Sequence, residues 1–227
     1  MMKRTVLLVL CLAGCGSPEP AAPPKPAPPE KVTFDGVTFP GGPADAKASG
    51  LIHCDGSMSG FTCEKTSQAA LLGVPALKAA AWLKPPERFQ VTAQNLDPPK
   101  PTPDDLRYDD VSFYFEETRH KYPCEADTPG DPTACVENPE RGIPAVERKL
   151  IDDGWKFSEW RSYRTYVKLG IPMEITVGGI GGDRDSISLR RMELAEVAEK
   201  HQGILTKEAE QQQKVGQEKA FIEQMAK

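Results

Sequence analysis

The chain has 227 residues, and its 33 acidic side chains outnumber its 28 lysines and arginines, which gives a net charge of −5. Proteins that bind nucleic acid present a basic face to the phosphates, so this acidic balance argues against a nucleic-acid partner. Aromatic residues make up only 7% of the chain. We therefore expect a modest hydrophobic core that crosslinks would help to stabilise.

The first residues have the pattern of a secretory signal. Met1 to Arg4 is short and positive, and Thr5 to Ala13 is an apolar run that is too short to span a bilayer, which needs about 20 residues. The run ends in Leu12-Ala13-Gly14-Cys15, which resembles the lipobox of bacterial lipoproteins. The resemblance is confined to residues 1–16. It implies a signal peptide at residues 1–14, cleavage before Cys15, a diacylglyceryl thioether on Cys15 and acylation of the new amino terminus.

The same resemblance implies where the protein is located. Membrane lipid would be a partner through Cys15, and several acyl chains together hold a protein on a membrane far better than one chain does. Gly16 follows the cysteine, where lipoproteins kept in the inner membrane usually have aspartate. We therefore expect an outer-membrane protein in the cell envelope that faces the periplasm or the exterior. The alternative is an ordinary secretory signal that is cut nearby.

Residues 15–30 are predicted to form a lipidated tether. Ser17 to Glu30 reads SPEPAAPPKPAPPE, and half of this segment is proline, a composition that favours extended polyproline II and cannot bury a core. At about 3.1 Å per residue it would reach roughly 45 Å. A plain spacer is the favoured interpretation, and a docking ligand for an aromatic groove is the alternative.

The cysteine count depends on this processing. Cys11 leaves with the signal and Cys15 is lipidated, so the cysteines left to pair are Cys54, Cys63, Cys124 and Cys135. An oxidising compartment favours two disulfides, for which four cysteines allow three pairings. We favour the local pairs Cys54–Cys63 and Cys124–Cys135, since each closes a turn-rich loop. The spacings do not fit the short cysteine pairs of a zinc site.

Residues 31–96 are predicted to form a small α+β subdomain. The near-repeat VTF-DG-VTF from Val32 to Phe39 indicates a β-hairpin, since Asp-Gly tolerates the positive φ angles of a type I′ turn. The alanine-rich segment from Ser67 to Leu83 predicts a helix that is kinked at Pro75, and Arg88 to Gln94 predicts a strand. Residues 97–109 read as a linker, and the sequence leaves open whether one or two domains are present.

Residues 110–191 are predicted to form an α+β domain. Asp110 to Glu117 predicts a strand, and Pro144 to Asp153 predicts a helix that Gly154 ends. Four further strands are expected, at Trp155 to Trp160, Tyr163 to Leu169, Met173 to Val177 and Ser186 to Arg190. This order indicates the α+β class, with a helix packed on an antiparallel sheet, a C-terminal helical tail and two local disulfides.

Residues 192–227 are predicted to form this helical tail. Gly203 and Gly216 weaken it, so we expect two helical pieces, the second of them partly exposed. Four apolar side chains exceed what a small core needs and are candidates for binding a partner: Val215, Phe221, Ile222 and Met225.

The motifs that carry catalysis or bind metals are incomplete. His53 to Gly60 has serines on either side of Met58 and lacks the Gly-x-Ser-x-Gly nucleophile elbow. His120 has no second histidine at ligand spacing. Residues 125–136 lack the final carboxylate of a calcium loop, and Val177 to Asp183 resembles a phosphate-binding loop only in its glycines. Aromatic residues between 155 and 166 are predicted to pack in the core, with a ligand cleft as the alternative: Trp155, Trp160, Tyr163 and Tyr166.

Two functions remain in view, and neither requires a cofactor or a metal. The favoured hypothesis is a non-enzymatic envelope lipoprotein that binds another envelope protein or scaffolds an assembly, and an immunity protein against a toxin would be one form of it. The alternative is a tethered hydrolase that acts on an envelope polymer. Its acid–base pair would come from carboxylates at Asp104, Asp105, Asp109, Asp110, Glu116 and Glu117.

Overall fold

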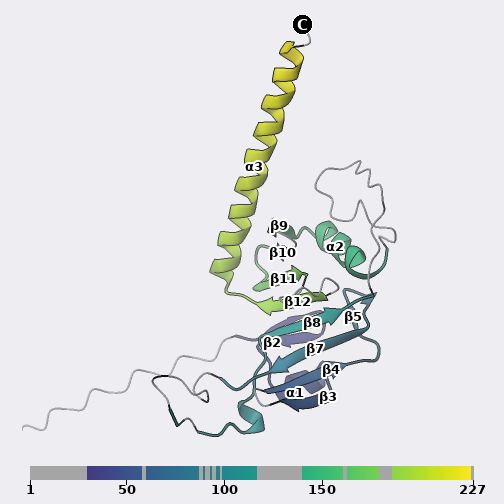
Figure 1. Cartoon of the computed structure of the whole chain (residues 1–227), viewed down its shortest axis with the longest axis vertical. Coiled ribbons are helices and arrows are strands. Elements are labelled where there is room, and N and C mark those ends of the chain that lie inside the picture. The colour runs from purple at the N-terminus through teal and green to yellow at the C-terminus, as the bar shows by residue number, and fades with distance from the viewer. Residues whose placement is uncertain are drawn as a thin grey trace, which may run out of the picture.

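The computed structural model describes residues 30–57, 60–86, 89, 93, 96–97, 99–116, 140–160, 163–178 and 186–225. Within these residues the fold is α+β, as predicted, and eight strands form one antiparallel sheet in the order β3-β4-β7-β8-β12-β11-β10-β9 (Figure 1). These strands are β3 (His53–Ser57), β4 (Gly60–Lys65), β7 (Lys78–Leu83), β8 (Asp110–Tyr114), β9 (Lys156–Trp160), β10 (Tyr163–Val167), β11 (Met173–Val177) and β12 (Ser186–Arg191).

The N-terminal hairpin has the predicted form. β1 (Val32–Phe34) and β2 (Val37–Phe39) pair in antiparallel fashion, and Asp35 and Gly36 both have positive φ, at 46° and 79°. Helix α1 (Pro43–Ala48) follows directly. The hairpin and α1 cover part of the sheet, because β2 buries Val37 and Phe39 in the main core.

The predicted helix from Ser67 to Leu83 is wrong. This segment forms a short hairpin, β5 (Ala70–Leu71) and β6 (Val74–Pro75), and then strand β7. Burial alternates along β7, with Ala79, Ala81 and Leu83 at most 3% exposed, and β4 and β8 hydrogen-bond to its two edges. Tertiary pairing therefore overrides the helix propensity of alanine. The strand expected from Arg88 to Gln94 falls mainly outside the described residues.

The second half follows the predicted order of strand, helix and strands. Helix α2 (Gly142–Asp152) precedes β9, β10, β11 and β12. Glu147 of α2 is fully buried and accepts hydrogen bonds from Arg164 Nε and Nη2 at 2.5 and 2.9 Å and from the Tyr166 hydroxyl at 2.8 Å. Burial, together with the Glu147 carboxylate, raises the pKa of Tyr166 far above its usual range. This cluster locks α2 onto one face of β10.

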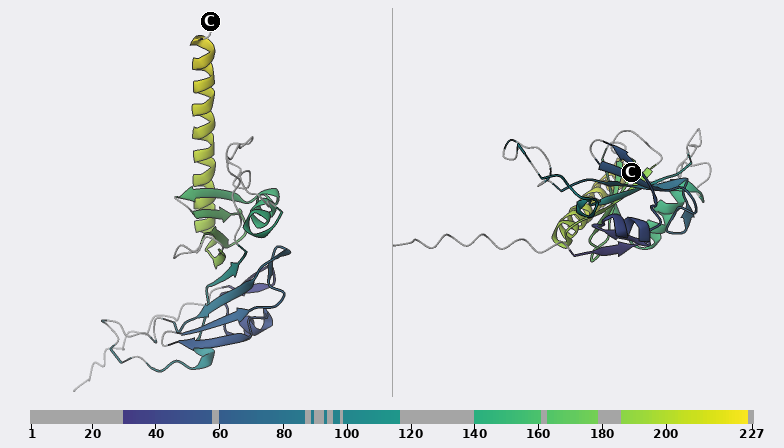
Figure 2. Two further views of the ribbon diagram at one scale, coloured as in Figure 1. Left: turned by 45° about the vertical axis from the view of Figure 1, so that its right-hand side comes forward. Right: turned by 90° about the horizontal axis from the view of Figure 1, so that it is seen from below.

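The other face of the same strands is covered by helix α3 (Leu194–Met225). Successive residues of a strand point to opposite faces, so Val167 points away from the α2 face that its neighbour Tyr166 occupies. A small second core forms there from Val167, Met192, Val197 and Ile204. The two views of Figure 2 show α2 and α3 on either side of this part of the sheet.

The tail is one continuous helix of 32 residues, and the prediction of two pieces is wrong. An added Cβ at Gly203 or Gly216 would meet no atom within 4 Å, so both glycines lie on an open side of the helix. Each lowers helix propensity by about 1 kcal/mol relative to alanine. That cost weakens the helix without interrupting it.

The sheet is continuous between the two halves of the chain, because β7 pairs with β8 from Lys78↔Tyr114 to Ala81↔Val111. The main hydrophobic core includes residues from both halves. The domain boundaries at 31–96, 97–109 and 110–191 stay a prediction.

One of the two predicted disulfides is confirmed. Cys54 and Cys63 face each other across β3 and β4 and are bonded, with a sulfur–sulfur distance of 2.07 Å. Cys124 and Cys135 lie outside the described residues, so their pairing stays a prediction.

Candidate functional site

The candidate site is the free half of α3. At 1.5 Å per residue, a helix of 32 residues is about 48 Å long, and Figures 1 and 2 show that it extends well past the sheet. Every side chain described from residue 209 to residue 225 is exposed. We call this segment, residues 209–225, the overhang.

The root of α3 is held by charge as well as by the second core. Glu174 of β11 accepts hydrogen bonds from Lys200 and, at 2.9 Å, from Arg190 Nη2, and its side chain is only 8% exposed. Lys156 of β9 donates to Glu208 at 3.0 Å. These bonds fix the direction in which the overhang leaves the body.

The overhang exists because the helix is longer than the sheet beneath it. The helix crosses from β11 at Lys200 to β9 at Glu208, and strands lie about 4.8 Å apart. β9 is the edge of the sheet. Residues beyond Glu208 would extend about 25 Å further, a distance equal to about five more strands. This part of α3 has no strand of the described sheet to pack on.

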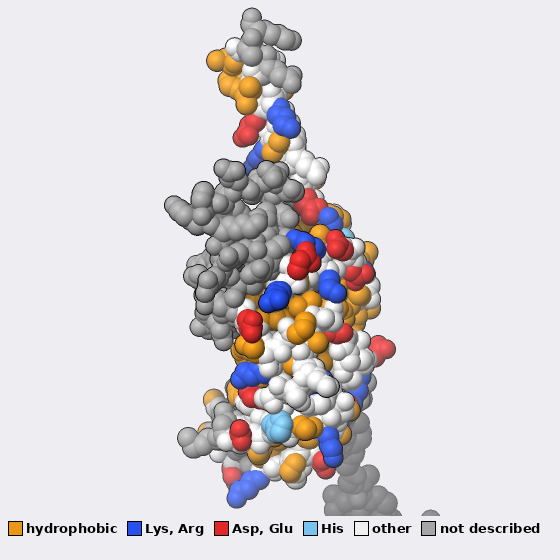
Figure 3. Space-filling view, turned by 90° about the vertical axis from the view of Figure 1, so that its right-hand side faces the viewer, with side chains coloured by type: hydrophobic (Ala, Val, Ile, Leu, Met, Phe, Trp, Pro, Cys, Tyr) orange, Lys and Arg blue, Asp and Glu red, His pale blue; other side chains and the backbone are white. Residues whose placement is uncertain are grey.

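The four residues predicted to bind a partner all lie on the overhang and are exposed. Their exposed fractions are 45% for Val215, 63% for Phe221, 65% for Ile222 and 75% for Met225. Hydrophobic side chains are visible near the free end of the helix in Figure 3. Exposure agrees with the predicted role, and binding itself stays a prediction.

The exposed apolar residues continue a face that is buried at the root. Val215 lies 18 residues after Val197, and Ile222 lies 18 residues after Ile204, which is five turns of an α-helix at 3.6 residues per turn. Val197 and Ile204 are buried against the sheet. Val215 and Ile222 therefore present, beyond β9, the same helix face that packs on the sheet below.

A groove lies where the overhang begins. Its volume is about 700 Å³, and it runs between the edge strand and the helix. Phe157, Ser158 and Glu159 line it from β9, and Ile204, Gln211 and Val215 are among the residues that line it from α3. The groove joins β9, which is the edge strand among the described residues, to the apolar face of the overhang. An edge strand has backbone groups that can pair with another strand.

The other sequence motifs do not assemble into a site in the described structure. His53 lies exposed at the start of β3, and His120, the segment 125–136 and most of the glycine-rich segment lie outside the described residues. The described residues hold no group of three or more histidine, cysteine, aspartate or glutamate side chains that could hold a metal ion.

Two of the aromatic residues at 155–166 pack in the core, as predicted. Trp155 is 3% exposed and meets Phe34 edge-on at 5.7 Å between ring centroids, and Tyr166 is buried against Glu147. Tyr163 is partly exposed, and the side chain of Trp160 lies outside the description.

Five of the six carboxylates proposed for hydrolysis belong to the described residues, and Glu117 lies outside them. Asp105 hydrogen-bonds the backbone and hydroxyl of Thr102. Desolvation by neighbouring atoms raises the pKa of Asp110, although the residue is exposed; the carboxylate of Asp109 adds to this shift. None of the five described carboxylates lines the groove.

No family model matches this chain, and neither the curated proteins nor the solved structures include one that is significantly similar to it. Among the described residues, no helix has both the length and the apolar character needed to cross a membrane. Helix α3 is long enough, but it is rich in charged and polar side chains. The overhang is therefore a candidate binding site on the evidence of its structure alone.

Sequence reasoning missed two parts of the site. It named the exposed apolar residues but not the groove, because the position of β9 at the sheet edge depends on strand order, which no local pattern encodes. It also missed Glu208, whose bond to Lys156 joins residues 52 positions apart.

Proposed function

We propose that this chain is a membrane-anchored envelope lipoprotein that binds another protein through the overhang and has no catalytic role of its own. One observation carries the proposal: the face of α3 that is buried at its root continues, exposed and apolar, beyond the edge of the sheet. Large exposed apolar side chains that cluster in space are a mark of interaction sites.

The lipobox resemblance at residues 12–15 supports the membrane attachment, and the proline-rich residues 17–30 support a spacer between membrane and body. A scaffolding or immunity-type role fits the same surface, since both require only binding. The alternative hydrolase has less support, because none of its five described candidate carboxylates lines the groove beside the overhang.

A truncation tests the proposal, provided that it spares the body. Ending the chain after Gly203 would remove Ile204, which is 7% exposed in the second core, and the bond from Lys156 to Glu208. Ending it after Gln211 keeps both and removes Val215 and everything beyond. We expect this variant to melt as the full chain does and to lose its crosslinked partner in the native envelope.

Single substitutions separate the apolar face from the helix itself. Ile222→Ser changes the exposed apolar face, whereas Gln213→Ser changes an exposed residue roughly half a turn away from it. We expect partner capture to fall at least about tenfold for Ile222→Ser, which corresponds to about 1.4 kcal/mol, and to be unchanged for Gln213→Ser. Equal capture by both variants and by the truncated chain would overturn the proposal.

A further inference from the structure

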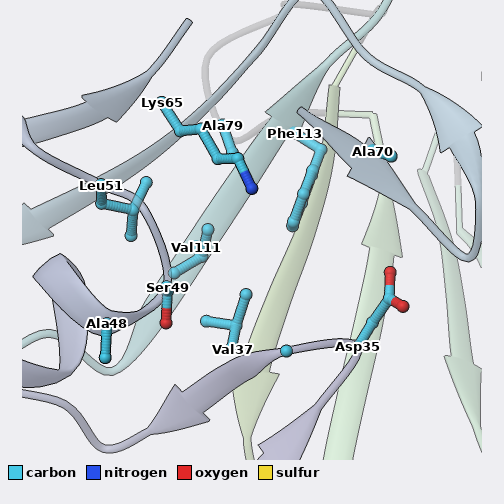
Figure 4. A pocket seen from close by; sticks show the side chains of 11 residues that line it. Asp35, Val37, Ala48, Ser49, Leu51, Lys65, Ala70, Ala79, Val111 and Phe113 are labelled. Atoms are coloured by element: carbon cyan, nitrogen blue, oxygen red, sulfur yellow. The ribbon is translucent and has the colours of Figure 1, made fainter. Parts of the chain in front are cut away.

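The groove beside β9 differs from a smaller hollow in the other half of the sheet. That hollow has a volume of about 200 Å³ and lies between the N-terminal hairpin and the sheet (Figure 4). Val37, Val111 and Phe113 are at most 6% exposed, so they offer a ligand almost no apolar surface. Val215, which lines the groove, is 45% exposed. The groove is therefore the place where an occupant can bury apolar surface.

The residues of α3 that line the groove are arranged symmetrically along the helix. They form three pairs, each centred on the point between residues 209 and 210: Ile204 and Val215, Lys207 and Gln212, and Glu208 and Gln211. β9 lines the groove with three consecutive residues centred on Ser158. A twofold interface between identical chains needs a surface that matches itself in this way, because residue i of one chain meets residue j of the other and residue j meets residue i.

The strand and the helix place such a twofold axis at the same position. If β9 pairs with β9 of a second copy, the axis lies halfway between the two strands, about 2.4 Å beyond β9. Lys156 of β9 bonds Glu208, and the centre of the lining on α3 lies one and a half residues further along the helix, which is about 2.3 Å. One axis can therefore relate both the two strands and the two helices.

This axis leaves room for both copies of α3. An antiparallel pair of strands has its twofold axis perpendicular to the sheet, so the two helices lie on the same face and run in opposite directions. α3 meets β9 near Lys156, two residues and about 7 Å from Ser158. The helices would therefore lie up to about 13 Å apart, somewhat more than the roughly 8–10 Å of helices in direct contact. Long side chains that line the groove, such as Gln211 and Gln212, would fill the remaining space.

The overhang of the second copy would find part of the sheet uncovered by α3. Val167 of β10 is fully buried beneath α3, whereas Thr165 and Tyr163, which lie on the same face of that strand, are partly exposed. The twofold axis carries the other copy's overhang over this part of β10. Val215 and Ile222, which continue the buried face of the root, would lie against it.

The apolar residues of the two helices also fall beside each other in this arrangement. Val215 would lie level with Ile204 of the second copy, and Ile222 level with its Val197, because both pairs are centred on the point between residues 209 and 210. Each apolar layer of one helix therefore falls beside an apolar layer of the other.

The area of the interface suits reversible association. An overhang about 25 Å long and 10 Å wide covers roughly 250 Å², so two overhangs bury about 1,000 Å² when both contacting surfaces are counted. The paired β9 strands add to this area. Standard protein interfaces bury about 1,200–2,000 Å², and those at the low end are often weak or transient.

We propose that the protein forms a twofold dimer in which β9 pairs with β9 of a second copy, centred on Ser158, and each overhang packs on the sheet of the other copy. The dimer rests on the proposed function and makes it more specific, because a second copy of this chain becomes the protein that the overhang binds. We expect a Kd on the order of 10 μM, as suits an interface of this size. Copies held in one membrane are concentrated enough to pair, whereas dilute protein is a monomer with a free overhang.

Cysteines at the strand edge test the position of the axis. Ser158→Cys should form a disulfide-linked dimer when the full-length protein is mildly oxidised in detergent, because the axis places the two cysteines directly opposite each other, about 5 Å apart. Glu159→Cys is the matched control. It lies next along the same edge and is more exposed, but its two copies would be about 8 Å apart, too far for a disulfide. We expect at least tenfold more linked dimer from Ser158→Cys, with the unsubstituted protein as the baseline.

Sedimentation equilibrium tests the part that the overhang plays in the dimer. The full-length protein, with detergent micelles in excess so that two copies rarely share one, should pass from monomer to dimer between about 1 and 100 μM. Ile222→Ser should weaken the dimer at least tenfold. Gln213→Ser, on the opposite side of the helix, should leave it unchanged. Melting curves of each variant establish that the body remains folded.

Three results would overturn the dimer: a protein that is still monomeric at about ten times the expected Kd, equal crosslinking of Ser158→Cys and Glu159→Cys, or equal dimerisation of Ile222→Ser and Gln213→Ser. A monomer that captures a different envelope protein, and loses it when truncated after Gln211, would overturn the dimer alone and leave the proposed function in place. A monomer whose truncation changes no capture would overturn both.

Discussion

The backbone of Gly41 lies directly against the ring of Tyr108. Their backbones exchange two hydrogen bonds, at 3.0 and 2.8 Å, and a Cβ on Gly41 would lie 2.1 Å from Cζ of Tyr108, which is fully buried. Gly41→Ala therefore forces the ring to move inside a packed core. We expect it to lower the free energy of unfolding by about 1–3 kcal/mol or more, measured by urea denaturation.

Gly73→Ala is the control for this substitution. Gly73 has a φ of +75° but open space around it, so alanine there incurs backbone strain without a clash, at a cost of about 1 kcal/mol. If Gly41→Ala is no more destabilising than Gly73→Ala, the close approach is not what requires glycine at position 41.

Asp45 is a residue whose charge contributes to stability. Partial burial opposes its ionisation, but hydrogen bonds from Lys31 at 2.8 Å and from the Gly42 amide at 2.9 Å dominate and hold its pKa below the usual 3.8. A lowered folded pKa stabilises the protein above the unfolded pKa and loses that contribution as the pH falls through the folded pKa.

We therefore expect Asp45→Asn to destabilise the protein at pH 7 by roughly 0.5–1 kcal/mol, a small value because Lys31 is exposed and the pair is screened. The difference between the two proteins should disappear as the pH is lowered below 3.8. Urea denaturation at neutral and acidic pH measures it. A difference that persists unchanged in acid would mean that capping geometry, rather than charge, is responsible.

At the scale of elements, the two glycines of α3 distinguish its root from its overhang. Gly203 lies among residues that pack on the sheet, whereas Gly216 lies in the overhang, and neither has a neighbour that alanine would strike. Alanine favours helix by about 1 kcal/mol at each position. We expect Gly203→Ala to raise the global free energy of unfolding by up to about that amount.

Gly216→Ala should instead act locally. The overhang makes no buried contact in the described structure, so its opening is independent of the body. We expect amide hydrogen exchange from residue 209 to residue 225 to slow by about fivefold, with global stability unchanged. A global gain from Gly216→Ala would show that the overhang packs on something in the free protein.

Elements whose signal is local could be predicted from sequence. The Asp35-Gly36 hairpin depends on turn chemistry, and α2 depends on its own periodicity. The segment from Ser67 to Leu83 could not be predicted in this way, because Ala79 to Ala81 favour helix locally and become a strand only through pairing with β4 and β8. Gly73 is the local feature of the sequence that argues against a continuous helix. It forms a turn with Leu72, in which the two residues have φ angles of 75° and 51°.

The candidate site likewise combines features that have a local sequence signal with features that depend on tertiary structure. Excess apolar residues at Val215 and Ile222 were readable from a tail that is otherwise polar. That they repeat the face of Val197 and Ile204 follows only once the helix is continuous, and Gly203 and Gly216 argue locally against continuity. The groove beside β9 could not be foreseen at all, since Phe157 of β9 and Val215 of α3 meet there from separate parts of the chain.

At the scale of the whole molecule, the N-terminal segment reaches the body at the end of α3 opposite to the overhang. The Glu30 carbonyl accepts a hydrogen bond from Arg191 Nε at 3.1 Å, and Arg191 ends β12 just before α3 begins. The proposed tether therefore reaches the body near the root of α3. The free end of the overhang lies about 48 Å from that root, so the helix sets how far the apolar face stands from the attachment point.

Tether length should then matter in the envelope and not in solution. Deleting residues 19–28 would shorten the proposed spacer by about 31 Å if it is extended as its proline content predicts, and it removes no residue of the body. We expect this variant to bind a purified partner in detergent as the full chain does, because the overhang is intact, and to capture that partner poorly when both are in the native membrane. Replacing residues 19–28 by a proline-rich segment of equal length and different sequence is the control. Recovery with the replacement means that reach is what the segment supplies, whereas failure with both variants would make residues 19–28 a binding site in their own right.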